Sequence, residues 1–240
     1  MRSPNKVEKL AYLYGPTYYT PKVKMCGISK VETIPAVVEA KPDYMGLVFA
    51  PSKRQVTVDQ AKILVEELHR GYAKKYGSDT KHDKNDTIKT VGVFVNETVD
   101  NLVTIANEAN LDAVQLHGDE DETFIQSLKE RTNVEVWKAV QIRSAADVEK
   151  WIDSSADMLL FDAYHKDERG GTGEVFDWSS LDAFERPFML AGGIDSTNVA
   201  RAIRTVRPYG IDISSGIETN GVKDDEKITA FTKIVKSIGR

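Results

Sequence analysis

Residues 188–218 read FMLAGGIDSTNVARAIRTVRPYGIDISSGIE, and this stretch holds a strand, a turn, a helix and a second strand. The apolar run 188–194 has the length of a strand, and a helical pattern over 198–203 separates it from the apolar run 211–214. Two strands joined through a helix run parallel, because an antiparallel pair needs only a hairpin. The stretch therefore predicts a strand–helix–strand unit within a parallel sheet.

The same unit recurs along the chain. Six further apolar runs of strand length precede this stretch, and helical patterns lie between several of the runs. The further runs cover 23–28, 44–50, 90–95, 113–117, 134–140 and 158–163, and the helical patterns cover 58–69, 99–109, 147–152, 198–203 and 227–238. Eight parallel strands alternating with helices form either an open sheet or a barrel. Eight units in about 215 residues favour the α/β class and a (β/α)8 TIM barrel, whose usual size is about 250 residues.

Two segments fall outside this pattern. Residues 1–20 are expected to be an N-terminal extension, and their tyrosines are expected to pin it onto the barrel. Residues 70–87 are polar, charged and glycine-containing, and they predict a long solvated loop. The remainder of 21–240 is expected to form one catalytic barrel domain.

Composition excludes several classes of protein. The 240 residues are 41% hydrophobic and 29% charged, as in ordinary globular proteins, and the net charge of −5 lacks the basic footprint of a nucleic-acid binder. The single cysteine, Cys26, allows neither a disulfide within the chain nor a multi-cysteine zinc site. No apolar run approaches the roughly 20 residues of a membrane span. We expect a cytoplasmic, monomeric protein that acts on neither nucleic acid nor a membrane.

Polar residues gather on one parity of the predicted strands. Alternate side chains of a strand face opposite ways, so in a barrel one set faces the helices and the other faces the interior. The polar residues on the interior set are Lys24, Cys26, Gln115, His117, Asp162, Asp212 and Ser214. Most of them lie late in their strands, at the end where barrel enzymes carry their chemistry.

Each of these residues alone also has a structural explanation. A lone Cys26 is typical of a small buried residue, and a lone His117 is typical of a structural histidine. Asp162 alone could cap a loop or pair with Lys138. Independent structural residues would not all collect at one end of one parity, so together they indicate a functional site.

Glycine-rich turns follow the last two predicted strands. The first contains Gly192 and Gly193, and the second contains Ser214, Ser215 and Gly216. Glycine allows the backbone to approach a ligand, and exposed N–H groups bind anions. Many barrels bind phosphate after strands seven and eight, so these turns predict a phosphate site. A third glycine cluster, at 170–173, is interpreted as part of a mobile lid.

Seven short motifs lie on the predicted strands and the segments that follow them, namely KMCGI at 24–28, VQLHG at 114–118, LFDA at 160–163, GGTG at 170–173, FDW at 176–178, LAGGI at 190–194 and DISSGIE at 212–218. Together these motifs resemble the phosphoribosylanthranilate isomerase family of tryptophan biosynthesis. They occur in the order found in that family, and the resemblance spans residues 22–240. The stretch NGVKD at 220–224 resembles fungal members most.

The resemblance implies a single (β/α)8 barrel and a reaction without cofactor or metal. N-(5-phosphoribosyl)anthranilate would be converted by an Amadori rearrangement into 1-(2-carboxyphenylamino)-1-deoxyribulose 5-phosphate. By resemblance Cys26 is the general base, Asp162 is the general acid and Arg54 meets the anthranilate carboxylate. The substrate-binding set expected with Arg54 is Gln115, His117, Asp212, Gly192, Gly193, Ser214, Ser215 and Gly216. The chemistry needs a protonated Asp162 and a Cys26 thiol whose pKa is lowered toward neutrality.

Departures from the family pattern are small. Gln55 stands where many members have an aromatic or small residue, and the loop 70–87 is longer than in compact bacterial members.

Two alternatives stay open. Another phosphate-binding barrel enzyme, similar to indole-glycerol-phosphate synthase or to an epimerase, would normally use a Lys–Glu pair or metal-bound aspartates instead of Cys26. A non-catalytic sugar-phosphate-binding barrel is the third hypothesis.

Overall fold

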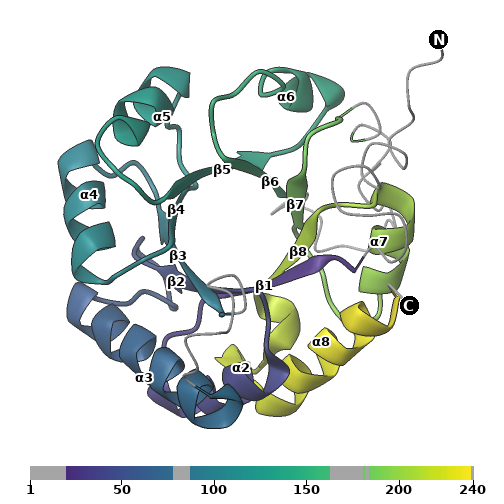
Figure 1. The fold of residues 1–240 in the computed structure, drawn as a ribbon. Coiled ribbons are helices and arrows are strands. Elements are labelled where there is room, and N and C mark those ends of the chain that lie inside the picture. The colour runs from purple at the N-terminus through teal and green to yellow at the C-terminus, as the bar shows by residue number, and fades with distance from the viewer. Residues whose placement is uncertain (1–19, 78–86, 163–180, 182–183, 239–240) are drawn as a thin grey trace.

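Eight parallel strands close into a barrel in sequence order in the computed structural model, which describes residues 20–77, 87–162, 181 and 184–238. Figure 1 shows this ring of strands with the helices outside it. Pairing of β1 with β8 closes the ring, so the predicted barrel is confirmed. The strands are β1 (Lys22–Cys26), β2 (Tyr44–Val48), β3 (Lys89–Phe94), β4 (Ala113–Leu116), β5 (Glu135–Gln141), β6 (Met158–Asp162), β7 (Phe188–Ala191) and β8 (Gly210–Ile213).

Helices follow the strands and cover the outside of the barrel (Figure 1). They are α2 (Ile34–Ala40), α3 (Val58–Tyr76), α4 (Val99–Glu108), α5 (Glu122–Lys129), α6 (Ala145–Glu149), α7 (Val199–Val206) and α8 (Asp225–Ile238). A short hairpin of β9 (Glu218–Thr219) and β10 (Val222–Lys223) lies between β8 and α8. The sequence pattern did not predict α2 and α5, which have seven and eight residues.

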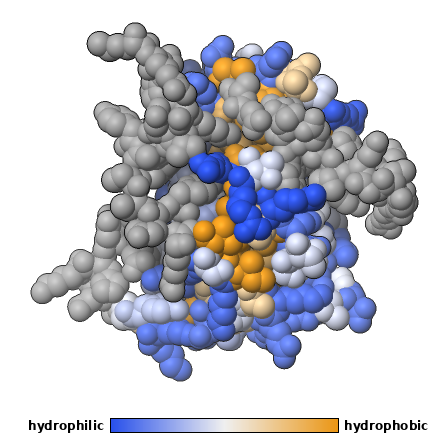
Figure 2. Space-filling view, turned by 90° about the vertical axis from the view of Figure 1, so that its right-hand side faces the viewer, coloured by the Kyte–Doolittle hydropathy of each residue, from blue (hydrophilic) through white to orange (hydrophobic). Residues whose placement is uncertain are grey.

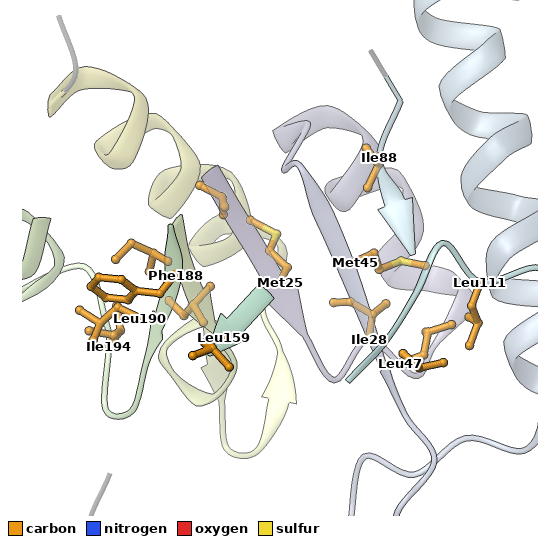
Figure 3. Close-up of a cluster of buried hydrophobic side chains, with 14 of the residues drawn as sticks. Met25, Ile28, Met45, Leu47, Ile88, Leu111, Leu159, Phe188, Leu190 and Ile194 are labelled. Atoms are coloured by element: carbon orange, nitrogen blue, oxygen red, sulfur yellow. The ribbon is translucent and has the colours of Figure 1, made fainter. Parts of the chain in front are cut away.

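The apolar core lies mainly between the strands and the helices. Strand residues of one parity point outward into it, among them Met25, Met45, Leu159 and Leu190, which are fully buried and appear in Figure 3. Burying apolar side chains in this layer supplies the main driving force for folding.

Residues of the other parity fill the barrel interior. Tyr44, Trp137, Leu160 and Met189 form a second apolar cluster there. The polar residues predicted for the interior belong to the same strand faces, since they alternate with the outward-pointing core residues. The predicted parity is therefore confirmed, and the interior is apolar toward one end of the barrel and polar toward the other.

Helix α3 is longer than the sequence pattern predicted. It begins at Val58, where Thr57 and Gln60 form a capping box, and it continues to Tyr76. The loop expected over 70–87 therefore begins later, because Tyr72 is buried and Tyr76 donates a hydrogen bond to the Val38 carbonyl of α2. Residues 78–86 lie outside the described residues, as do 1–19 of the expected extension and 164–175 of the expected lid.

The outer surface of the barrel is mostly polar. On the face drawn in Figure 2, hydrophilic residues frame a narrow band of hydrophobic ones beside the grey segments. Within the described residues, no helix combines the length and the apolar character that crossing a membrane requires.

A buried ion pair joins the loops after β3 and β4 to strand β5. Lys138 Nζ lies 2.9 Å from Glu120 Oε2 and also donates to the Gly118 carbonyl, and both charged side chains are almost fully buried. Glu120 accepts two backbone N–H groups as well, from Asn96 and Gly118. Lys138 is therefore the partner of Glu120, whereas the sequence alone also allowed Lys138 to pair with Asp162.

Replacing Lys138 by Met should destabilise the barrel by about 3–5 kcal/mol, because it leaves the Glu120 carboxylate buried without its cation. The matched control is Lys62→Met, which breaks an exposed pair with Glu108 and should cost less than about 1 kcal/mol. Urea unfolding of both variants measures the difference. Equal losses in the two variants would contradict a structural role for the buried pair.

Candidate active site

A cavity of about 650 Å³ opens at the C-terminal ends of the strands. It is lined by residues from seven of the eight barrel strands and from the segments that follow them, although these lie far apart in the sequence. Nearly all the site residues predicted from the sequence meet in it, namely Cys26, Arg54, Gln115, His117, Asp162, Gly192, Gly193, Asp212, Ser214 and Ser215. Lys53 and Val95 also contribute to the wall.

Gly216 is the one predicted site residue that does not line the cavity. A Cβ at this position would lie 2.2 Å from the carbonyl oxygen of Ile194, so only glycine allows the turn after β8 to approach the turn after β7. Gly192 and Gly193 line the cavity with φ angles of 94° and 59°, in the left-handed region that favours glycine. Gly216 thus sets the distance between the two turns rather than forming the wall.

Asp162 and His117 lie next to each other in the wall of the cavity. His117 Nε2 lies 3.6 Å from Asp162 Oδ2, and Gln115 Nε2 lies 3.0 Å from His117 Nδ1. An amide nitrogen only donates, so Nδ1 of a neutral His117 accepts and the ring proton is on Nε2, toward Asp162. Gln115 thereby fixes the orientation of the imidazole that borders Asp162.

Cys26 ends β1 and is almost completely buried at the floor of the cavity. Burial raises the pKa of its thiol above the ordinary value, and the ammonium groups of Lys24 and Lys223 oppose that rise. The pKa of Cys26 is therefore raised overall, whereas the chemistry inferred from the sequence requires a lowered pKa. The expectation is not met, because desolvation of the thiolate outweighs the attraction of the nearby cations.

Arg54 is held by a carboxylate of this chain. Its Nε donates to Glu218 Oε1 at 2.6 Å and its Nη2 donates to Oε2 at 3.0 Å, a bidentate pair. Lys223 and Lys53 also lie near Glu218, at 3.1 and 3.6 Å. Burial raises the pKa of Glu218, but the hydrogen bonds and charges of Arg54 and Lys223 outweigh it and lower the pKa to about 2.

Sequence reasoning missed the roles of Lys24, Glu218 and Lys223. Lys24 is fully buried and pairs with Asp212 at 3.0 Å between Nζ and Oδ2. Its position two residues before Cys26, on the same strand parity, was a usable signal. Glu218 and Lys223 belong to the β9–β10 hairpin, and no sequence pattern indicated that this hairpin contacts Arg54 at the cavity wall.

No group of three or more His, Cys, Asp or Glu residues is arranged to hold a metal ion in the part of the chain that the structure describes. The cavity offers neutral and cationic donors together with the carboxylates of Asp162 and Asp212. Such a set can bind an anionic ligand and move protons at it.

Replacing Glu218 by Gln should change how stability depends on pH. The native pKa of about 2 lies below the ordinary value of 4.5, so the charged carboxylate stabilises the fold above about pH 4.5. That stabilisation is lost as pH falls from 4.5 toward 2. The variant should therefore be less stable at neutral pH and lose less stability across this acid window. Melting temperatures from pH 7 to pH 2 test this, and parallel curves for the two proteins would contradict it.

Comparisons with known proteins agree with this geometry. The family model described as N-(5'phosphoribosyl)anthranilate (PRA) isomerase matches residues 23–234. The isomerase of Thermoanaerobacter sp. is 45% identical over 219 residues, which cover 90% of this chain and 98% of the relative. The isomerase of Endomicrobium trichonymphae is 43% identical over 222 residues, covering 91% of this chain and all of the relative.

Solved structures lead to the same family. The crystal structure of the isomerase from Thermotoga maritima is 34% identical, covers 90% of this chain and 99% of its own, and gives a TM-score of 0.75. A phosphoribosyl anthranilate isomerase in complex with reduced 1-(o-carboxyphenylamino)-1-deoxyribulose 5-phosphate is 32% identical, with the same coverage and a TM-score of 0.71. The two relatives above are bacterial, so the expected likeness to fungal members is not borne out. This chain belongs to the N-(5'-phosphoribosyl)anthranilate isomerase family.

Proposed function

We propose that Cys26 as general base and Asp162 as general acid carry out the family reaction, the aldose–ketose isomerisation of N-(5'-phosphoribosyl)anthranilate in tryptophan biosynthesis. The observation that carries this assignment is that one cavity contains both residues, on β1 and β6, together with the two glycine turns. An enzyme that used a lysine–glutamate pair or metal-bound aspartates would not need Cys26 in the cavity.

The first step opens the ribose ring. Asp162 donates its proton to the ring oxygen as the bond from C1 to that oxygen breaks, and the anthranilate nitrogen supplies the electron pair of the new C1=N bond. The product is a cationic Schiff base with a neutral hydroxyl. His117, oriented by Gln115, borders the Asp162 carboxylate that remains.

The second step removes the proton from C2 of the sugar. The Cys26 thiolate takes it, the bonding electrons form C1=C2, and the electrons of C1=N return to nitrogen. The resulting enol becomes the ketone when C1 gains a proton and the C2 hydroxyl loses one. The proton that the Cys26 thiol gives up and the proton that the Asp162 carboxylate takes back balance these two transfers. Because the Schiff base is a cation, its formation beside Cys26 favours the thiolate at the step that uses it.

The anthranilate carboxylate is assigned to the free edge of Arg54. A guanidinium has five N–H donors, and Glu218 uses only one from Nε and one from Nη2. The edge formed by Nη1 and the second Nη2 proton can therefore accept another carboxylate in bidentate fashion. Glu218 fixes the plane of the guanidinium while Arg54 lines the cavity.

The substrate phosphate is assigned to the turns after β7 and β8. Gly192, Gly193 and Ser215 line the cavity there, and the left-handed glycines leave room for an anion beside the backbone. Phosphate at these turns and carboxylate at Arg54 would hold the two ends of the substrate. Gln115, Asp212 and Ser214 are the groups we assign to the sugar between them.

The remaining expectations are part of this proposal. We propose that the protein is active as a monomer. A cytoplasmic location fits the single free thiol in the site, which functions only while reduced. We keep residues 21–240 as the catalytic domain and 1–20 as an extension to it.

Cys26→Ala and Asp162→Asn should each lower kcat by about 10²–10⁴-fold, because each removes one proton-transfer step. Cys26→Ser should fail as well, since a hydroxyl is too weak a base near neutral pH. Binding of a product analogue and the melting temperature should stay close to those of the wild type. Steady-state turnover, ligand titration and thermal unfolding of the three variants measure this. A Cys26→Ala variant that melts earlier and turns over normally would show that Cys26 only packs.

Arg54→Met should raise KM roughly 10- to 100-fold, because hydrogen bonds to a charged group contribute about 1.5–3 kcal/mol. The matched control is a substrate analogue without the anthranilate carboxylate, which should bind the variant and the wild type about equally. Titration of both ligands against both proteins tests the assignment. Equal weakening of the two ligands would mean that Arg54 is not the carboxylate partner.

A further inference from the structure

Lys24 is a buried cation inside the barrel with an unusual pair of neighbours. Its side chain has no exposed surface, and its Nζ lies 3.0 Å from Asp212 Oδ2 on the adjacent strand β8. Lysine is almost never fully buried without a partner, so Asp212 accounts for its presence. An ammonium group has three N–H donors, however, and this carboxylate oxygen takes only one of them.

Gly46 on β2 shows what lies on the other side of the ammonium. A Cβ at this position would be 2.9 Å from Cys26 Sγ and 3.2 Å from Lys24 Nζ. Sulfur and nitrogen thus border the same notch, which only a residue without a side chain leaves open. Strand pairing places Gly46 directly beside Cys26, so the notch is built into the register of β1 and β2.

The other charged groups near Cys26 are already balanced. Lys223 of β10 donates to the Ser214 carbonyl at 2.8 Å and lies 3.1 Å from Glu218. Arg54, from the segment after β2, is held by the same Glu218. Elsewhere in the cavity wall are His117, which directly follows β4, and Asp162 of β6. Lys24 is therefore the cation best placed for Cys26, and Asp212 of β8 is the anion that competes for it.

We propose that Lys24 is the counter-ion of the Cys26 thiolate and that Asp212 holds the ammonium beside the sulfur. Lys24 is then a positioning residue, since it acts on the substrate only through Cys26. The inference rests on the proposed function in one respect, namely that the thiolate is the base. Burial alone raises the pKa of Cys26, and Lys24 is the largest opposing influence.

The thiol can be titrated without substrate, because Cys26 is the only cysteine in the chain. We would measure the rate of alkylation by iodoacetamide as a function of pH in the full-length protein. Lys24→Met should raise the apparent thiol pKa and slow alkylation at a fixed pH below it by about tenfold, which corresponds to one pKa unit. Lys24→Arg keeps the charge and should restore most of the rate.

Two further variants keep the test decisive if Lys24→Met does not fold. Asp212→Asn removes the competing anion and should speed alkylation. Lys24→Met combined with Asp212→Asn removes both charges, so it avoids a buried unpaired carboxylate, and it should alkylate more slowly than Asp212→Asn alone. If the double variant and Asp212→Asn have the same pH profile, or if folded Lys24→Met matches the wild type, Lys24 only pairs with Asp212 and the proposal is overturned.

Turnover separates this inference from the proposed function. If Cys26 is the base, the pH dependence of kcat in Lys24→Arg and in the double variant should move in parallel with the thiol titration. A thiol pKa that shifts as expected while the kcat profile stays in place would support the ion pair and remove Cys26 from the base role. Lys223→Met is the control cation, and it should move the thiol titration less than Lys24→Met.

Discussion

The alternation of side chains along eight parallel strands is the constraint on which the molecule depends. Outward residues such as Met25 and Leu159 pack against helices, so every inward residue is committed to the barrel interior. Once the ring closes through β1 and β8, inward residues from distant parts of the sequence become neighbours. Lys24 and Asp212 are 188 positions apart and share a hydrogen bond for this reason.

This constraint also explains how much could be predicted from the sequence. A period of two is visible locally, so the strands, their inward faces and the positions of Cys26 and Asp162 could be predicted. Pairings between distant side chains could not, because no local pattern indicates that Glu218 lies against Arg54. The end of α3 was equally hidden, since residues 70–76 are polar in composition and become helical through Tyr72 and Tyr76, which contact their surroundings only in the folded protein.

The direction of the Cys26 pKa shift could not be predicted from the sequence for a related reason. A sequence shows that a lysine is near a cysteine, which suggests a lowered pKa, but it does not show how completely water is excluded. Here burial dominates and the cations compensate only in part. The site thus combines a desolvated position, in which the thiolate is reactive once it has formed, with positive charges that limit the free-energy cost of forming it.

The contact between the last and first helices of the described barrel bears on how other protein segments could be attached. Lys236 near the end of α8 donates to the carbonyls of Ala40 and Lys41 at the end of α2, which places the end of α8 on the side where β1 begins. The cavity lies on the opposite side, at the strand ends that include Cys26. Sequence joined at either terminus of the barrel therefore starts away from the mouth of the cavity. Tethering the barrel to another enzyme or to a surface would leave the path of substrate and product open.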